Sequence, residues 1–132
     1  VASSYKDREE GCLFCGLPKD RIIAENKLAY AVYDGYPVTE HHILIIPKRH
    51  TPTYFDLYQP EINACNQLLQ EMKAKIEEED DTVTGFNIGM NNGEDAGQTV
   101  FHCHIHLIPR RQGDVDTPKG GVRGVIPSKQ GY

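Results

Sequence analysis

Apolar residues fall into four short runs that predict β-strands. The runs cover 28–34, 42–47, 84–90 and 100–108, and each is rich in β-branched or aromatic residues. A short segment with turn-forming residues, beginning at Asp34, separates the first two runs. This spacing predicts a hairpin, and strands joined in this way favour an antiparallel sheet.

One segment has helical periodicity instead. Within 60–79, apolar residues recur three and four positions apart, and Pro60 suits the first turn of a helix. The positions expected to face the core are Ile62, Cys65, Leu68, Leu69, Met72 and Ile76. Residues 110–132, where Gly and Pro recur, are expected to form an irregular C-terminal extension. Strands with one long helix predict the α+β class.

Length and charge narrow the class of protein. A chain of 132 residues is expected to form one domain, here over 12–132, preceded by an N-terminal tail over 1–11. The net charge of −5 argues against general nucleic-acid binding. No apolar run reaches the roughly 18 residues of a membrane span, and the tail lacks the apolar core of a signal peptide. We therefore expect no membrane association and a cytoplasmic location.

The last predicted strand carries three alternating histidines. Side chains on a strand point to opposite faces in turn, so His102, His104 and His106 are expected to share one face. The other, apolar face would carry Cys103, Ile105 and Leu107. Such histidines could bind a metal, or one imidazole could attack phosphorus while its neighbours donate to phosphate oxygens. The preceding loop, with small residues and the polar Gln98 and Thr99, favours the phosphate chemistry.

These residues resemble the histidine triad (HIT) family. The similarity is strongest from Gly97 to Pro109 and from His42 to His50, and it extends to Asp34, Asn91 and Gly93. A bare alternation of three histidines would be weak evidence. The Gln-Thr pair before it and the second histidine-containing hairpin at the right separation make the resemblance specific.

The resemblance, which covers about 12–110, implies a fold and an assembly. The expected fold is an antiparallel sheet of about five strands with helices. The expected assembly is a symmetric homodimer in which two sheets join into one of ten strands. Residues from Arg110 onward are similar to the C-terminal extension of bacterial and archaeal-type members, where Arg110, Arg111, Lys119 and Arg123 could reach a distal phosphate or could simply be surface charges.

The resemblance also implies a mechanism on a purine nucleotide. His104 would be the nucleophile that attacks the α-phosphorus and forms a covalent nucleotidyl-histidine, and water would then resolve it. His106 would donate to the phosphate or the leaving group, with His42 close behind it. The expected substrate-binding residues are Asp34 for the ribose, Asn91 lining the pocket, and Gln98 and Thr99 for phosphate oxygens.

Four cysteines raise the question of a metal. Cys12 and Cys15 form a CxxC motif that is shared by zinc and redox sites, and the βαβ context of a thioredoxin-like site is absent. The resemblance includes a subset of the family in which zinc is held by Cys12, Cys15, His50 and His102. Such a closed Cys2His2 site is structural. Cys65 and Cys103 are expected to be packing residues.

Three hypotheses follow for function. The first is a hydrolase or transferase that cleaves nucleoside phosphoramidates, adenylates or dinucleoside polyphosphates at the α-phosphate. The alternatives are a metalloenzyme whose histidine triad itself binds the metal, and a non-catalytic module that binds zinc and nucleotides. One position departs from the family pattern, because His41 stands where Gly is frequent. We expect the His41 side chain to be exposed and incidental.

Overall fold

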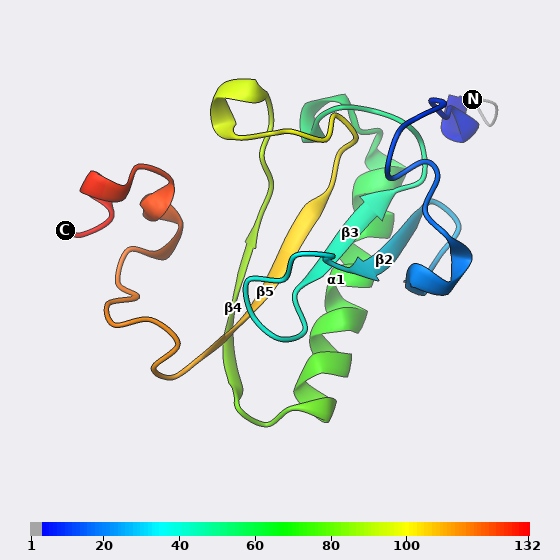
Figure 1. Cartoon of the computed structure of the whole chain (residues 1–132). Coiled ribbons are helices and arrows are strands. Elements are labelled where there is room, and N and C mark those ends of the chain that lie inside the picture. Colours follow the sequence, from blue (N-terminus) through cyan, green and yellow to red (C-terminus); the bar gives the residue numbers. More distant parts are fainter. Residues whose placement is uncertain (1–3) are drawn as a thin grey trace.

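Five antiparallel strands form one sheet in the computed structural model, which describes residues 4–132 (Figure 1). The strand order is β1-β2-β3-β5-β4, with all neighbours antiparallel. The strands are β1 (Ile22–Glu25), β2 (Ala29–Tyr33), β3 (Ile43–Pro47), β4 (Val83–Gly89) and β5 (Ile105–Arg111). This arrangement confirms the predicted α+β class. The first three residues of the predicted N-terminal tail lie outside the described part.

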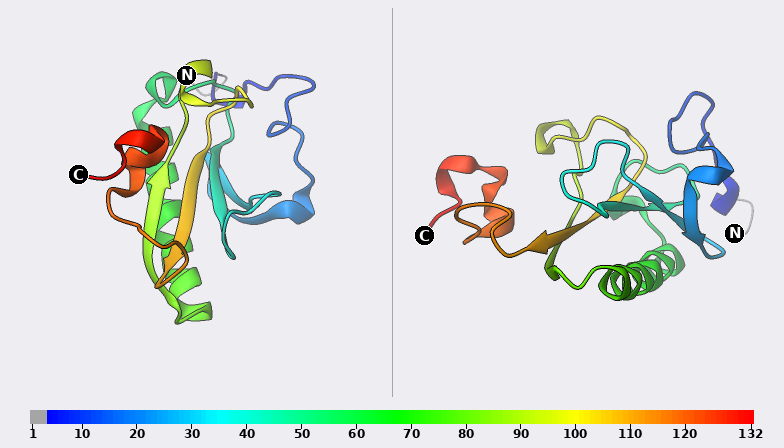
Figure 2. Two further views of the ribbon diagram at one scale, coloured as in Figure 1. Left: turned by 60° about the vertical axis from the view of Figure 1, so that its left-hand side comes forward. Right: turned by 60° about the horizontal axis from the view of Figure 1, so that its bottom comes forward.

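The α-helix α1 (Gln59–Glu79) covers one face of the sheet (Figure 2). Its buried apolar side chains pack on the alternate residues of β2, β3 and β5 that face it, including Ile43, Ile45 and Leu107. The buried residues on the helix are Glu61, Cys65, Leu68, Met72 and Ile76. Among residues 4–132, no helix combines the length and apolar composition that a bilayer span needs.

The buried set of α1 differs from the prediction at three positions. Ile62 and Leu69 are only half-buried, whereas Glu61 is fully buried. The Glu61 carboxylate accepts two hydrogen bonds from the Arg49 guanidinium, each 2.9 Å long, and one from the backbone N–H of Tyr58. A buried carboxylate is tolerated because a cation and a backbone donor replace its water.

The opposite face of the sheet carries a second apolar cluster and the chain before β1. Phe14 packs there with Tyr30, Val32, Leu44 and Ile46. The N-terminal segment thus covers this face, and the Tyr30 hydroxyl donates a hydrogen bond to the carbonyl of Phe14. Since α1 occupies the other face, polar side chains that point away from the helix can gather on this side.

Two strand predictions need correction. No strand was expected at β1, which is short and only half-buried. The predicted strand over 100–108 is displaced: β5 pairs with β3 only from Ile105 onward, and the Cys103 N–H instead donates to the carbonyl of Thr51. β5 continues through Pro109, where β4 alone accompanies the strand because β3 pairs only as far as Leu107.

The C-terminal segment runs past the β4 edge of the sheet, as Figure 1 shows. It contains two short 3-10 helices, Gly121–Val125 and Pro127–Lys129, and is otherwise irregular, as predicted. Several of its apolar side chains are exposed, including Val122 and Val125. Ile88 on the neighbouring edge strand β4 is exposed as well.

Candidate active site

A cavity of about 640 Å³ opens on the face of the sheet opposite α1. It lies between the N-terminal segment, the loop after β2, the loop after β4 and the start of β5. Six of the seven residues predicted for catalysis or substrate binding line it: Asp34, Asn91, Gln98, Thr99, His104 and His106. The seventh, His42, lies behind His106 and is buried.

His104 presents one free ring nitrogen. Its Nδ1 atom lies 2.8 Å from the carbonyl oxygen of His102, which can only accept a hydrogen bond. In the neutral imidazole the proton is therefore on Nδ1, and Nε2 keeps its lone pair. The Phe14 ring packs edge-on against His104, with ring centroids 4.9 Å apart. A neutral imidazole held by a carbonyl in this way is suited to nucleophilic attack.

His42 and His106 form a pair with a defined proton arrangement. The backbone N–H of Val38 donates to His42 Nδ1 over 3.1 Å, so the neutral His42 ring carries its proton on Nε2. That Nε2 lies 2.9 Å from His106 Nδ1, which must then accept. His106 is left with its proton on Nε2, as a donor. Burial lowers the pKa of His106 to about 4, so the ring is neutral near pH 7.

Asp34 lies beside this pair. Its Oδ2 atom is 3.4 Å from His42 Nε2 and 3.9 Å from His106 Nδ1, and its Oδ1 accepts the backbone N–H of Tyr36. Burial is the main reason that the pKa of His42 is lowered, and the negative charge of Asp34 opposes the shift. Asp34 thus lines the cavity and also contacts the histidine pair.

The predicted phosphate-binding residues differ in whether their side chains have hydrogen-bonding groups left for a ligand. The buried Gln98 amide donates to the carbonyls of Pro52 and Val100 and accepts the N–H of Gly93, so it holds the loop together. Thr99 is exposed at the cavity and carries the available hydroxyl. Asn91 is half-buried against Gly97, whose φ of 96° is a backbone conformation that favours glycine.

Cys12, Cys15, His50 and His102 come together as the resemblance implied. Their four ligand atoms lie within 4.8 Å of one another. The separations from the His102 Nδ1 to the two Sγ atoms are 3.4 and 3.5 Å, and Cys15 Sγ is 3.4 Å from His50 Nδ1. A tetrahedral zinc with usual bond lengths would place sulfur and nitrogen ligands about 3.6 Å apart. The cluster therefore fits a zinc ion.

The outer ring nitrogens of both histidines at this cluster are also occupied. His102 Nε2 lies 2.7 Å from the carbonyl of Pro47, so Nδ1 is left with the lone pair that a metal needs. His50 Nε2 lies 3.2 Å from a carboxylate oxygen of Glu9. A carboxylate or carbonyl behind a ligating histidine is the usual arrangement at metal sites. Glu9 was not singled out in the sequence because it falls in the expected tail.

Comparison with known proteins agrees with this geometry. The family model described as the HIT domain matches residues 18–113. This chain belongs to the histidine triad family. The resemblance found in the sequence is therefore confirmed. An uncharacterised HIT-like protein from Mycoplasma pneumoniae is 35% identical over 75% of this chain and 71% of its own length.

Two further proteins are similar over most of this chain. An asymmetrical bis(5'-nucleosyl)-tetraphosphatase from Schizosaccharomyces pombe is 34% identical over 71% of the chain and 51% of its own length. The solved structure of a zinc-bound histidine triad protein from Mycobacterium smegmatis superposes with a TM-score of 0.71. It is 34% identical over 79% of this chain and 78% of that one.

Sequence reasoning missed the apolar wall of this histidine triad site. Leu13, Phe14 and Leu17 line the cavity from the N-terminal segment, and Leu44 and Val100 line it from the sheet side. Leu13 and Phe14 are the two residues between the cysteines of the CxxC motif. The sequence does carry a sign of this wall. Two adjacent apolar residues stand between the expected metal ligands, although a metal site does not itself require apolar residues there.

The four basic residues of the C-terminal segment do not converge on a phosphate site. Arg110 is paired with Asp114 and Asn87, and Arg111 with Asp80. Arg123 donates to carbonyls of its own segment, and both it and Lys119 lie over the ring of Tyr132. In this structure these cations hold the chain together.

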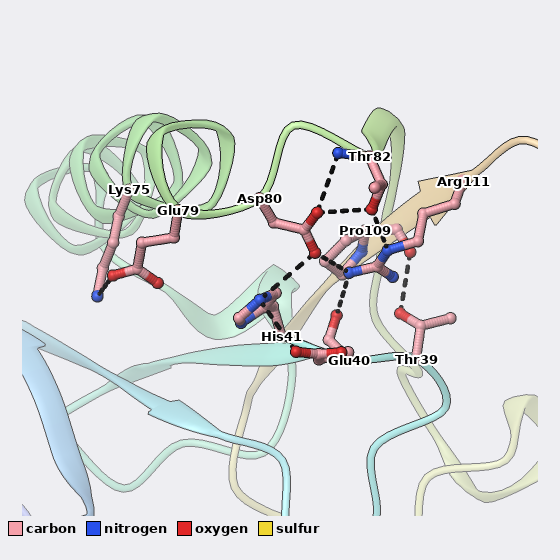
Figure 3. A network of polar contacts seen from close by, with 9 residues as sticks. All are labelled: Thr39, Glu40, His41, Lys75, Glu79, Asp80, Thr82, Pro109 and Arg111. Carbon is pink, nitrogen blue, oxygen red and sulfur yellow. Dashed lines mark hydrogen bonds and ion pairs between the residues drawn. The ribbon is translucent and has the colours of Figure 1, made fainter.

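The expectation that the His41 side chain is exposed is wrong. Its side chain is only 20% exposed, and its Nε2 lies 3.6 Å from carboxylate oxygens of Glu40 and Asp80 (Figure 3). His41 also has a φ of 72°, in the left-handed region. A sequence cannot show this contact, because Asp80 lies at the far end of α1.

Proposed function

We propose that this histidine triad protein is a nucleotide hydrolase or transferase that acts at the α-phosphate through a covalent nucleotidyl-His104 intermediate. The observation that carries the proposal is the hydrogen bond from His104 Nδ1 to the carbonyl of His102, which leaves Nε2 as a lone-pair donor at the cavity. The substrate class is a purine nucleoside phosphoramidate, an adenylate or a dinucleoside polyphosphate. The hydrolase names of relatives such as the yeast tetraphosphatase support the reaction class.

In the first step, His104 Nε2 bonds to the α-phosphorus and the bond from phosphorus to the leaving group breaks. The His102 carbonyl then stabilises the positive charge on the His104 ring through Nδ1–H. His106 is neutral and presents Nε2–H, so it stabilises charge on the leaving atom or a phosphate oxygen as a hydrogen-bond donor. The leaving group takes its final proton from water.

In the second step, water attacks the phosphorus and the bond to His104 Nε2 breaks. The ring regains its lone pair, the nucleoside monophosphate leaves, and the remaining proton of water goes to solvent. Thr99 and the backbone of its loop bind the phosphate oxygens, while Asp34 and Asn91 position the ribose side of the nucleotide. The Gln98 side chain contributes by holding this loop in shape, because its amide is already bonded.

We propose zinc as the metal held by Cys12, Cys15, His50 and His102, with a structural role. Zinc would supply no reacting group, since four protein ligands close its coordination. It would join the N-terminal segment, through Cys12 and Cys15, to His50 and His102. The carbonyl of His102 is the one that accepts the hydrogen bond from His104. Ligand spacing and the free Nδ1 of His102 support this assignment.

The homodimer and the cytoplasmic location are parts of the same proposal. β4 is an edge strand with one free side, and Ile88 on it is exposed. Pairing of two such edges would give the expected ten-strand sheet and would cover apolar surface that a monomer leaves in water.

The metalloenzyme hypothesis has less support from the geometry. His102 is directed to the cysteines, and His42 carries its proton on the nitrogen that faces His106 and Asp34. A protonated ring nitrogen cannot bind a metal. The non-catalytic module remains the second hypothesis, and the experiment below separates it from the first.

The test is a substrate panel followed by phosphorus NMR. The panel contains an adenosine phosphoramidate, an acyl adenylate and diadenosine tetraphosphate, each with wild-type protein and with His104→Ala. We expect turnover of at least one substrate by the wild type alone, and a nucleotide adduct on the His104-containing peptide after rapid quenching in alkaline denaturant, because acid would cleave the phosphorus–nitrogen bond of the adduct. Nucleotide binding without turnover of any substrate would support the non-catalytic module instead.

A further inference from the structure

The residue before His42 has an unusual backbone conformation. Among residues 4–132, His41 is the only non-glycine residue with a positive φ. Residues with a Cβ atom disfavour this region, although histidine enters it more readily than most. The conformation occurs where the loop after β2 turns into β3, and His42 is the next residue. His42 thus directly follows the residue with this conformation.

Side-chain contacts hold His41 on the side of the sheet away from the cavity. Its Nε2 lies 3.6 Å from Asp80 Oδ2, at the end of α1, and 3.6 Å from Glu40 Oε1. Hydrogen bonds from Thr82 and from the Arg111 guanidinium lower the pKa of Asp80 to about 2, so this carboxylate stays charged near neutral pH. Figure 3 shows the His41 ring between the two carboxylates.

The same corner anchors the backbone of the loop. The Arg111 guanidinium donates to the carbonyl of Glu40 over 3.1 Å, and the Thr39 hydroxyl donates to the carbonyl of Pro109 over 2.9 Å. Both partners belong to β5, the strand that carries His106. The loop before His42 is thus fastened to the strand that carries His106, through the Thr39 and Arg111 contacts drawn in Figure 3.

A metal site at this corner is a poor alternative. Glu40, His41 and Asp80 do offer three ligand atoms within 4.8 Å. However, Arg111 Nη2 lies 3.0 Å from the same Asp80 oxygen that faces His41. The guanidinium already supplies the positive charge that the carboxylate attracts, and it would repel a cation placed beside it.

We propose that His41 is a positioning residue, whose contact with Asp80 keeps His42 hydrogen-bonded to His106 so that His106 presents its Nε2 proton to the cavity. The turn at His41 sends its own ring toward α1 and the His42 ring toward His106, where the two nitrogens are 2.9 Å apart. The proposal rests on the proposed function for its effect on turnover, but not for its effect on the histidine pair.

The first test reads the histidine pair directly, without a substrate. Nitrogen-15 NMR of the imidazole rings distinguishes a protonated from an unprotonated ring nitrogen. In the wild type we expect single tautomers for His42 and His106, both protonated at Nε2. His41→Gly accommodates the positive φ but removes the ring, so we expect averaged tautomer signals for both histidines. Unchanged single tautomers in His41→Gly would overturn the proposal.

The second test reads turnover. For a substrate with a basic leaving group, we expect His41→Gly to be about 10- to 100-fold slower, because small errors in position cost that much. For a nitrophenolate leaving group the loss is expected to stay below about threefold, since that group needs little help from a donor. Binding of adenosine monophosphate is expected to change by less than about threefold.

Matched variants separate positioning from stability. Lys75→Ala lies in the same corner but removes only a pair with Glu79, and we expect wild-type spectra and turnover (Figure 3). His41→Asn keeps a residue that tolerates the left-handed region and replaces His41→Gly if that variant does not fold. A loss of turnover that is equal for both leaving groups would mean a general structural role and would overturn the proposal.

The two proposals can fail separately. If the wild type turns over no nucleotide but His41→Gly still disturbs the tautomers, the positioning role holds and the proposed function fails. If the wild type is active and His41→Gly keeps both its tautomers and its turnover, the proposed function stands and His41 has no positioning role.

Discussion

The Nε2 atom of His42 lies 2.9 Å from the Nδ1 atom of His106, and the backbone N–H of Val38 decides which nitrogen of the pair carries the proton. A backbone N–H can only donate. The main chain therefore sets the donor-to-acceptor direction of the two hydrogen bonds that run from Val38 through His42 to His106. His104 is held in the same way by the His102 carbonyl. Main-chain groups thus prepare a donor and a nucleophile at one cavity.

The nucleophile assignment predicts a selective defect. His104→Ala is expected to lower turnover at least 1,000-fold, on the order of the loss of a covalent catalyst. It is expected to leave thermal stability and nucleotide binding nearly unchanged, because the ring is only half-buried at the cavity. Turnover and binding are measured on the same preparation. Turnover within tenfold of wild type would contradict the assignment.

The donor assignment predicts a dependence on the leaving group. His106→Ala is expected to cost about 100- to 1,000-fold for a basic amine or alkoxide leaving group, the usual effect of removing one hydrogen-bond donor from developing charge. The cost for a nitrophenolate is expected to be much smaller. Rates are compared across a leaving-group series. A uniform loss would assign His106 to substrate binding alone.

The metal site predicts one zinc per chain. Replacing both Cys12 and Cys15 with Ser is expected to release the metal and lower the melting temperature by several degrees, because zinc joins three separate segments. Cys65→Ala is the control: it leaves a cavity beneath α1 and is expected to lower stability while keeping the zinc. Metal analysis of reduced protein gives the answer, and a wild type without zinc would refute the assignment.

The neutral histidine pair predicts acid sensitivity. The folded pKa of His106 is about 4 because of burial, whereas the unfolded value is about 6.5. Between these values the unfolded chain binds more protons, so the free energy of unfolding falls as pH drops from about 6.5 to about 4. In urea titrations, His106→Asn is expected to reduce that slope by up to about 1.4 kcal/mol per pH unit. Equal slopes for the two proteins would show that His106 does not titrate in this window.

The buried ion pair predicts a large stability effect far from the cavity. Glu61→Leu leaves the Arg49 guanidinium without its carboxylate and is expected to cost about 3–5 kcal/mol of unfolding free energy. Lys73→Ala removes a half-exposed pair with Glu77 and is expected to cost less than about 0.5 kcal/mol. Denaturant unfolding compares the two. Similar small losses would mean that the buried pair is compensated by other contacts.

The local sequence pattern was enough to predict those elements whose conformation depends on residues that are near one another in the chain. The helix over 59–79 and the β2–β3 hairpin follow from periodicity and turn residues, and the structure has both. Alternation also placed Cys103, Ile105 and Leu107 on the buried side. The motif around His104 was enough to identify the family, because the three histidines and the loop before them are adjacent in sequence.

Tertiary structure alone decided which side chains stay free to act. Gln98 looked like a phosphate ligand, but its amide is used by the carbonyl of Pro52, which is distant in sequence, and by the Val100 carbonyl and Gly93 N–H of its own loop. Glu61 is buried because Arg49 reaches it from another element, and His41 contacts Asp80 across the end of α1. The periodicity of a sequence predicts on which face of a strand or helix a side chain lies. Its hydrogen bonds and ion pairs depend on which residues of other elements the fold places next to it.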